Sequence, residues 1–253
     1  MTTHSKTVIG SAVTAASRAT TGTISIPSGK GGTLVAVEAQ VFGTLETVVN
    51  TGGLVELEND AVDWKPFEFY TDKKTCVTLG AVPLTPTRIP CHKNLPANST
   101  VTVYYTPQDD QSQKLSVTIH WIEGAFSGRQ TYMKSGIGSA ITQITTASAH
   151  VSISIPAEKG GRVKAIQAQV WGTLETVVNS GGLVALKNES AAVSWEPTEF
   201  YTFGDTAVTS GGVELLPQLI PVDLDLPGNS TVKADYTPQD NQSQKLSLSI
   251  IWE

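Results

Sequence analysis

Apolar and polar residues alternate along much of this chain, and a period of two is typical of strands that bury one face. The segment 114–121 shows it most clearly, because its apolar side chains share one face: Leu115, Val117, Ile119 and Trp121. The segments 100–105 and 35–41 alternate in the same way. The counterpart of the second, 164–170, begins with Lys164 on the apolar side, which we attribute to a strand end. No segment carries the capped apolar stripe of an amphipathic helix, so the pattern predicts strands.

The pattern occurs twice, because the chain contains a long internal repeat. Residues 39–57 and 168–186 are identical at 16 of 19 positions, and residues 105–116 and 236–247 are identical at 11 of 12. Equivalent residues lie 129 positions apart in the first part of the repeat and 131 apart in the second, so one loop gained two residues. Each copy, of about 120 residues, has the size of a self-sufficient domain. The repeat therefore predicts two tandem domains.

Proline and glycine separate the alternating segments at matching places in the two copies. Proline cannot donate to a strand ladder and marks strand ends; it recurs at Pro27/Pro156, Pro66/Pro197, Pro90/Pro221, Pro96/Pro227 and Pro107/Pro238. Segments 50–53 and 179–182 each end in Gly-Gly, which suits tight turns. Roughly seven or eight strands fit between these breaks in each copy. We expect an all-β chain with two tandem antiparallel β-sandwich, jelly-roll-like domains that arose by internal duplication.

Two segments do not alternate, and each precedes the first strand expected in its copy. Residues 1–20 and 124–148 are rich in Ser, Thr, Ala and Gly. We therefore assign 1–20 as a polar N-terminal arm, 21–123 as the first β-sandwich domain, 124–148 as a linker or arm, and 149–253 as the second domain. Such arms would be flexible or would add a strand to a neighbour's sheet.

Composition narrows the function classes. Charged residues make up 16% of the chain and the formal net charge is −6, with no basic cluster in either copy. We therefore expect no direct contact with nucleic acid. No apolar run reaches the ~18–20 residues that span a bilayer, so we expect no membrane span. The N-terminus lacks a basic segment followed by an apolar one, so we expect no secretory signal.

No catalytic, metal or cofactor site stands out in both copies. The histidines show no metal-ligand spacing: His4, His92, His120 and His150. Cys76 and Cys91 occur only in the first copy, which favours buried thiols over a disulfide, although a bridge between them stays open. A hydrolase would need two close carboxylates, and the shared candidates are Glu46, Glu68, Glu175 and Glu199. We expect no cofactor, no metal and no enzymatic activity.

One aromatic segment occurs in both copies. It begins at Trp64 and reaches Tyr70 in the first copy, and it begins at Trp195 and reaches Tyr201 in the second. An exposed platform of these four rings could bind sugars, because sugar C–H faces pack on aromatic rings. The competing interpretation is core packing, since large rings dominate the cores of small sandwiches.

A polar loop is also retained. Its residues are Thr106, Pro107, Gln108, Asp109 and Gln111 in the first copy and Thr237, Pro238, Gln239, Asp240 and Gln242 in the second. Surface loops usually diverge first, so two explanations for its retention stay open. Either both copies present this loop to equivalent partners in an assembly, or the turn needs these residues for its own hydrogen bonds.

These features favour a non-enzymatic structural protein that self-assembles through its tandem domains. Tandem jelly rolls with leading arms resemble the coat proteins of icosahedral viruses, a similarity of architecture that no motif carries. The expected partners are further copies of the chain or other structural subunits. The chain would then be part of a virion, and otherwise we expect it in the cytoplasm. The alternative is a bivalent, lectin-like carbohydrate-binding module that uses the aromatic segment of each copy.

Overall fold

The computed structural model describes residues 2–14, 16–43, 48–71, 73–77, 86–108, 112–172, 178–202, 205–207, 213–215, 218–241 and 243–253. The chain divides into two compact units. The first is formed by Met1–Lys74 with Pro83–Tyr132, and the second by Thr75–Val82 with Met133–Glu253. We call these units domain 1 and domain 2. The described residues form no helix that is long and apolar enough to cross a bilayer.

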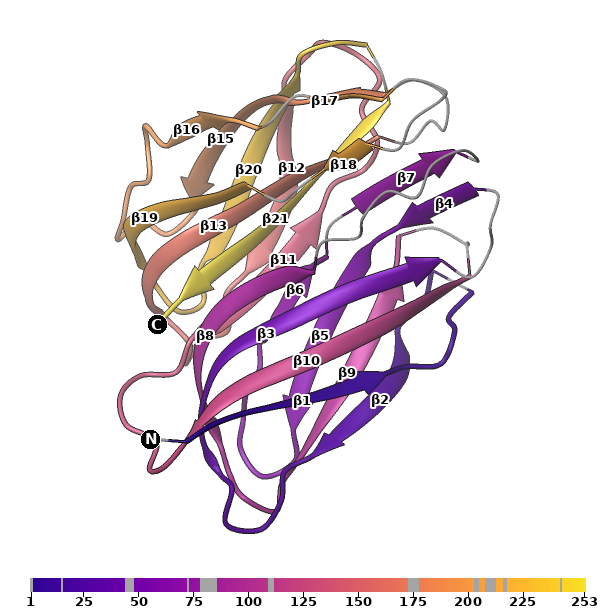
Figure 1. Cartoon of the computed structure of the whole chain (residues 1–253). Helices are drawn as coiled ribbons and strands as arrows, with labels where there is room; N and C mark the ends of the chain where they lie inside the picture. The colour runs from indigo at the N-terminus through magenta and orange to yellow at the C-terminus, as the bar shows by residue number, and fades with distance from the viewer. Residues whose placement is uncertain are drawn as a thin grey trace. The chain divides into compact units, whose positions relative to one another are not determined.

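Domain 1 contains two four-stranded antiparallel sheets (Figure 1). Their strands are β1 (Thr3–Ile9), β2 (Ala19–Ser25), β3 (Gly32–Gly43), β5 (Gly53–Asn59), β6 (Glu68–Tyr70), β8 (Thr87–Leu95), β9 (Thr100–Pro107) and β10 (Gln113–Glu123). The first sheet has the order β1-β10-β3-β8 and the second β2-β9-β5-β6. When the eight strands are numbered in chain order, the first sheet holds strands one, eight, three and six, and the second holds strands two, seven, four and five. This alternation between two sheets is the jelly roll.

Domain 2 has the same topology. Its strands are β11 (Tyr132–Ile137), β12 (Ala147–Ser154), β13 (Gly161–Gly172), β15 (Gly182–Asn188), β16 (Glu199–Tyr201), β19 (Gln218–Leu226), β20 (Thr231–Pro238) and β21 (Gln244–Trp252). They form sheets of order β11-β21-β13-β19 and β12-β20-β15-β16. Short strands lie outside the four sheets: β4 (Val48–Thr51), β7 (Lys73–Val77), β14 (Val178–Ser180), β17 (Asp205–Ala207) and β18 (Val213–Leu215). The prediction of two tandem jelly-roll-like sandwiches is confirmed.

The alternating side chains build the two cores as predicted. On β10 the apolar set from Leu115 to Trp121 is buried, and on β9 Val101, Val103 and Tyr105 are fully buried. The residues between them face outward and remain partly exposed. Each sheet therefore buries one face, as in other antiparallel sandwiches.

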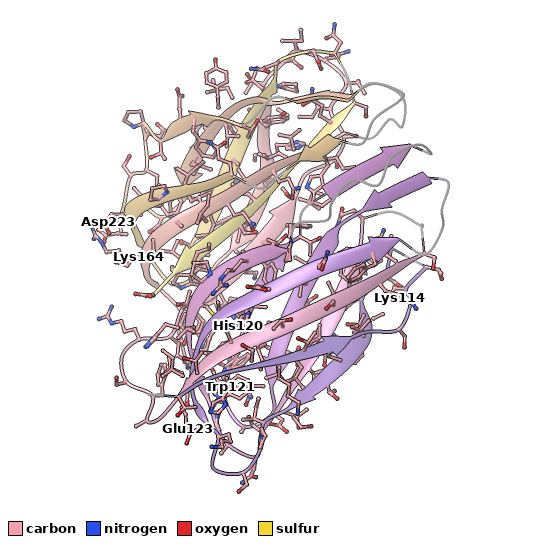
Figure 2. The ribbon with its side chains drawn as sticks, viewed as in Figure 1. Lys114, His120, Trp121, Glu123, Lys164 and Asp223 are labelled. Carbon is pink, nitrogen blue, oxygen red and sulfur yellow. The ribbon has the colours of Figure 1, made fainter. Side chains whose placement is uncertain are left out.

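A β-bulge corrects the prediction that Lys164 faces inward. The register of β13 against β21 and β19 shifts between Val163 and Ala165, so Lys164 is the extra residue and is exposed. It lies at the surface beside Asp223 (Figure 2). The same shift occurs in β3 between Leu34 and Ala36. A bulge turns the extra residue away from the regular alternation, which is why Lys164 needs no apolar surroundings.

The segments expected to be arms contain the first strand of each jelly roll. All seven residues of β1 pair with β10, from Thr3 opposite Ile122 to Ile9 opposite Ser116. β11 takes the same place beside β21. Domain 1 also extends past residue 123, because Thr131 and His92 exchange hydrogen bonds: Thr131 N donates to His92 O at 2.8 Å and His92 N to Thr131 Oγ1 at 2.9 Å.

Candidate functional site

The retained polar loop of domain 1 is closed by a buried hydrogen-bond network. Gln113, the first residue of β10, is fully buried. Its Oε1 accepts the Tyr105 hydroxyl at 2.6 Å and the Gly52 N–H at 3.2 Å. Gln108 N donates to Gly52 O at 3.1 Å, so the loop is tied to the Gly-Gly turn before β5. We call Tyr105, Gln113 and Gly52 the glutamine network of domain 1.

The turn beside this network requires glycine. Gly53 N donates to Thr71 Oγ1 at 3.0 Å, which joins the start of β5 to the end of β6. A Cβ atom on Gly53 would lie 2.3 Å from Thr106 O. No side chain fits at that distance, so the second glycine of the turn allows β5 to approach β9.

Domain 2 repeats the glutamine network with Tyr236, Gln244 and Gly181. Gln244 Oε1 accepts the Tyr236 hydroxyl at 2.8 Å and the Gly181 N–H at 3.1 Å. Gln244 Nε2 donates to Asp240 Oδ1 at 2.8 Å, a contact within the retained loop. Burial, with a smaller contribution from the Asp240 charge, raises the pKa of Tyr236 far above its usual range. The phenol is therefore a neutral donor at all ordinary pH values.

These contacts supply an internal reason for retention of part of the loop. Pro107 and Pro238 are buried, Thr106 and Gln108 are half-buried, and Gln239 is exposed. Thr237 Oγ1 lies 2.8 Å from Thr146 Oγ1. Asp109, Gln111 and Gln242 lie outside the described residues. The network itself could not be found from sequence, because Gly52 is distant along the chain from the tyrosine and glutamine that it joins.

Three of the four platform residues are buried. Trp64 and Trp195 lie in the cores, where their Nε1 atoms donate to Asn94 O at 2.7 Å and Asp225 O at 2.8 Å. Tyr70 is only 4% exposed, whereas Tyr201 is 62% exposed. The interpretation as an exposed platform is therefore corrected to core packing for three of the rings. The tryptophans are buried because large aromatic rings fill the core of each sandwich.

The two domains satisfy the carbonyl of the core tryptophan differently. In domain 1 the fully buried Lys93 donates from Nζ to Trp64 O at 2.7 Å, with the Phe67 ring 5.0 Å away. Domain 2 has Leu224 and Thr198 at these two positions. There the Thr198 hydroxyl donates to Trp195 O. An ammonium beside an aromatic ring has thus been exchanged for a local hydroxyl.

The outward side of the second sheet also differs between the domains. In domain 1 Arg18 bonds Glu56 and Glu58, each at 2.9 Å, and its guanidinium lies 3.5 Å from the Tyr104 ring centroid. In domain 2 Lys187 bonds Asp235 at 2.9 Å. Leu54 pairs with Tyr70 in domain 1, and Leu183 pairs with Tyr201 in domain 2. Only the second of these pairs has an exposed ring.

The remaining sequence candidates do not converge in the described part of the chain. No group of three or more His, Cys, Asp or Glu side chains that could hold a metal ion occurs among the described residues. Burial raises the pKa of the Cys91 thiol to about 12, so Cys91 is a free thiol that stays protonated. The Cys76 side chain, Glu46 and Glu175 lie outside the described set. Glu68 and Glu199 are on the short strands β6 and β16.

No family model matches the chain, and no curated protein matches it. Solved structures do. PNGase F, a glycosylasparaginase from Flavobacterium meningosepticum, is 12% identical with a TM-score of 0.49, over 99% of this chain and 96% of that one. PBCV-1 Vp54, fitted into a reconstruction of the virophage Sputnik, is 10% identical with a TM-score of 0.38, over 99% and 94%.

A further solved structure is the tandem CBM22 domain of Xyn10C from Paenibacillus barcinonensis. It is 9% identical with a TM-score of 0.27, over 91% of this chain and 82% of that one. At these identities and TM-scores, no activity, ligand or partner is transferred to this chain.

Proposed function

We propose that this protein is a non-enzymatic structural subunit that assembles with copies of itself through its two jelly-roll domains. Its role would be that of a coat protein, and its place the virion. One observation carries the proposal. Large apolar side chains are 50% to 67% exposed at four described positions: Ile9, Ile144, Tyr201 and Leu219.

These exposed side chains lie on or beside the edges of sheets. Ile9 ends β1, Tyr201 ends β16, Leu219 is on β19, and Ile144 precedes β12, all of them edge strands. Edge strands present unpaired backbone groups, and a partner that contacts such an edge would also bury the apolar side chains beside it. Their placement therefore supports association along the edges of the sandwiches.

Edge strands of these sheets also carry residues that oppose simple strand addition. Lys6 lies on β1, Pro90 on β8 and Pro221 on β19. Lysine and proline on an edge strand prevent uncontrolled pairing with other sheets. Association would therefore use side-chain contacts at defined places, which suits an assembly of fixed geometry better than open aggregation.

Native mass spectrometry and light scattering over a concentration series would test the proposal. We expect oligomers for the parent chain and a shift toward monomer for Tyr201→Ser combined with Leu219→Ser. Glu199→Gln is the matched control, because it changes an exposed residue of β16 without removing apolar surface, and it should leave the mass distribution unchanged. A parent chain that stays monomeric at high concentration would contradict the proposal.

Carbohydrate binding is the second candidate, and the exposed ring of Tyr201 favours it. Polar groups surround the Leu183–Tyr201 pair on one sheet face. They come from Glu199 on the same strand, from Thr237, and from the Lys187–Asp235 pair. Because the twin Tyr70 is buried, we expect one site in domain 2. Glycan-array binding that Tyr201→Ala abolishes and Tyr201→Phe keeps would support this function, and an array without any bound glycan would end it.

A further inference from the structure

We propose that β1 exchanges between copies, so that the N-terminal strand of one chain pairs with β10 of another. This inference rests on the proposed self-assembly and names one of its contacts. Strand exchange reuses the contacts that already exist within one chain, and it is therefore a low-cost way to join two copies. It also avoids the outer edge of β1, where Lys6 opposes strand addition.

The side-chain hydrogen bonds between β1 and β10 lie at the surface or are part-buried, and the His4 ring also lies 5.2 Å from that of the buried Trp121. Thr7 Oγ1 lies 2.8 Å from Thr118 Oγ1, and Ser5 Oγ lies 2.7 Å from His120 Nδ1. His4 Nε2 lies 2.8 Å from Glu123 Oε2. His120 and Glu123 are both on β10 (Figure 2). Exposed polar pairs compete with water and contribute little net stability.

β1 also contributes little to the core. None of its residues is fully buried, and only His4 and Val8 are even half-buried. β1 itself thus buries little apolar surface, which is the main term that holds most strands in place, whereas Val13, which would move with it, is buried. The backbone ladder of seven residues remains, and a second copy would supply the same ladder.

The exchanging segment has defined ends. Beyond β1, Gly10 N donates to Leu115 O at 2.8 Å, and Val13 and Gln113 exchange backbone hydrogen bonds. The N-terminal segment that is hydrogen-bonded to β10 and to the residues at its start thus extends to Val13. On the other side, Arg18 is fixed to domain 1 by Glu56, Glu58 and Tyr104. Exchange would therefore move the residues up to Val13 and leave Arg18 in place.

The matching strand of domain 2 is held differently. On β11, Met133 is fully buried, and Ser135 Oγ lies 2.6 Å from Ser249 Oγ on β21. β11 also has folded chain on both sides, since domain 1 precedes it and β12 follows it. Exchange of β11 would therefore have to move a folded domain with it. The Ser135–Ser249 pair is therefore a matched control for Thr7–Thr118.

Cysteine pairing between two different chains would test the exchange. In a background with Cys76→Ala and Cys91→Val, the residues of the second copy, one chain carries Thr7→Cys and the other Thr118→Cys. The chains are mixed, unfolded, refolded and oxidised. A disulfide between the two different chains forms readily when β1 of one chain lies on β10 of the other, and each chain oxidised alone shows how much dimer forms by collision. We expect a strong heterodimer band on a non-reducing gel, and no such band for Ser135→Cys mixed with Ser249→Cys.

Two measurements make the outcome decisive. One chain with both Thr7→Cys and Thr118→Cys must form its disulfide, which shows that the geometry permits the bond. Light scattering on the same mixtures reports assembly. Oligomers without the heterodimer band would overturn strand exchange and leave self-assembly standing. Monomers without the band would overturn both, and an equally strong band from the control pair would overturn exchange specific to β1.

Discussion

Domain 1 and domain 2 share an internal hydrogen-bond frame but differ in the side chains around it. In both, a buried glutamine accepts from a tyrosine hydroxyl and a glycine N–H. In both, the last core tryptophan donates from Nε1 to a turn carbonyl, Trp121 to Lys30 O at 2.6 Å and Trp252 to Lys159 O at 2.5 Å. Duplication thus preserved these two sets of polar contacts, whereas the surface and the buried donor to the core tryptophan carbonyl diverged.

The largest expected effect comes from removing the buried glutamine of either network. Gln113→Leu leaves the Tyr105 hydroxyl and the Gly52 N–H without their acceptor, and Gln244→Leu does the same in domain 2. Each substitution should lower the free energy of unfolding by roughly 2–4 kcal/mol, because two buried donors lose a partner. Urea unfolding measures both. A large loss in one domain with none in the other would show that the networks are not equivalent.

A smaller effect should come from replacing the donor to Trp64 O in domain 1 by the donor that Trp195 O has in domain 2. Lys93→Leu and Phe67→Thr give domain 1 the residues that domain 2 has. Together they should cost about 1 kcal/mol less than the sum of the single substitutions, because the new hydroxyl replaces the lost ammonium as donor. A double-mutant cycle by urea unfolding checks this. Strict additivity would mean that Trp64 O does not depend on either donor.

The smallest effect is a difference in pH dependence between the domains. Burial lowers the pKa of His150 below its ordinary value of 6.5, and its Nε2 accepts the Leu246 N–H at 3.3 Å, which only neutral imidazole can do. The unfolded chain therefore binds a proton at higher pH than the folded one, so the stability of domain 2 falls as the pH drops through about 6.5 and levels off below the folded pKa.

Domain 1 has Thr21 at the position of His150. Hydrogen exchange of the amides of β12 and β20 should therefore speed up more between pH 7.5 and 5.5 than that of β2 and β9, after correction for intrinsic rates. His150→Thr should remove the difference. If the substituted chain keeps the same pH dependence, another group is responsible.

The inward faces and the two domains could be predicted from the sequence, because the alternation of apolar residues shows which side chains are buried and the internal repeat shows two similar units. These patterns missed β1 and β11. Their partners lie at the far end of each domain, and most residues of β1 are exposed and polar, so no alternation marks the strand. Lys164 was misplaced because a bulge depends on pairing with another strand. The glutamine network could not be predicted either, because it also depends on which strands pair.

The similarity of the two copies has a cost during folding. β3 and β13 are identical at six of 12 positions, so each can pair with either β10 or β21 while the chain is incomplete, and adjacent similar domains are prone to such misassembly. Discrimination must come from the positions that differ. Glu38 on β3 lies 3.3 Å from His120 on β10 and bonds Arg88, whereas against β21 it would meet Ile251. A polar residue opposite Glu38 on β10, where β21 has an apolar one, thus favours the pairing of β3 with β10.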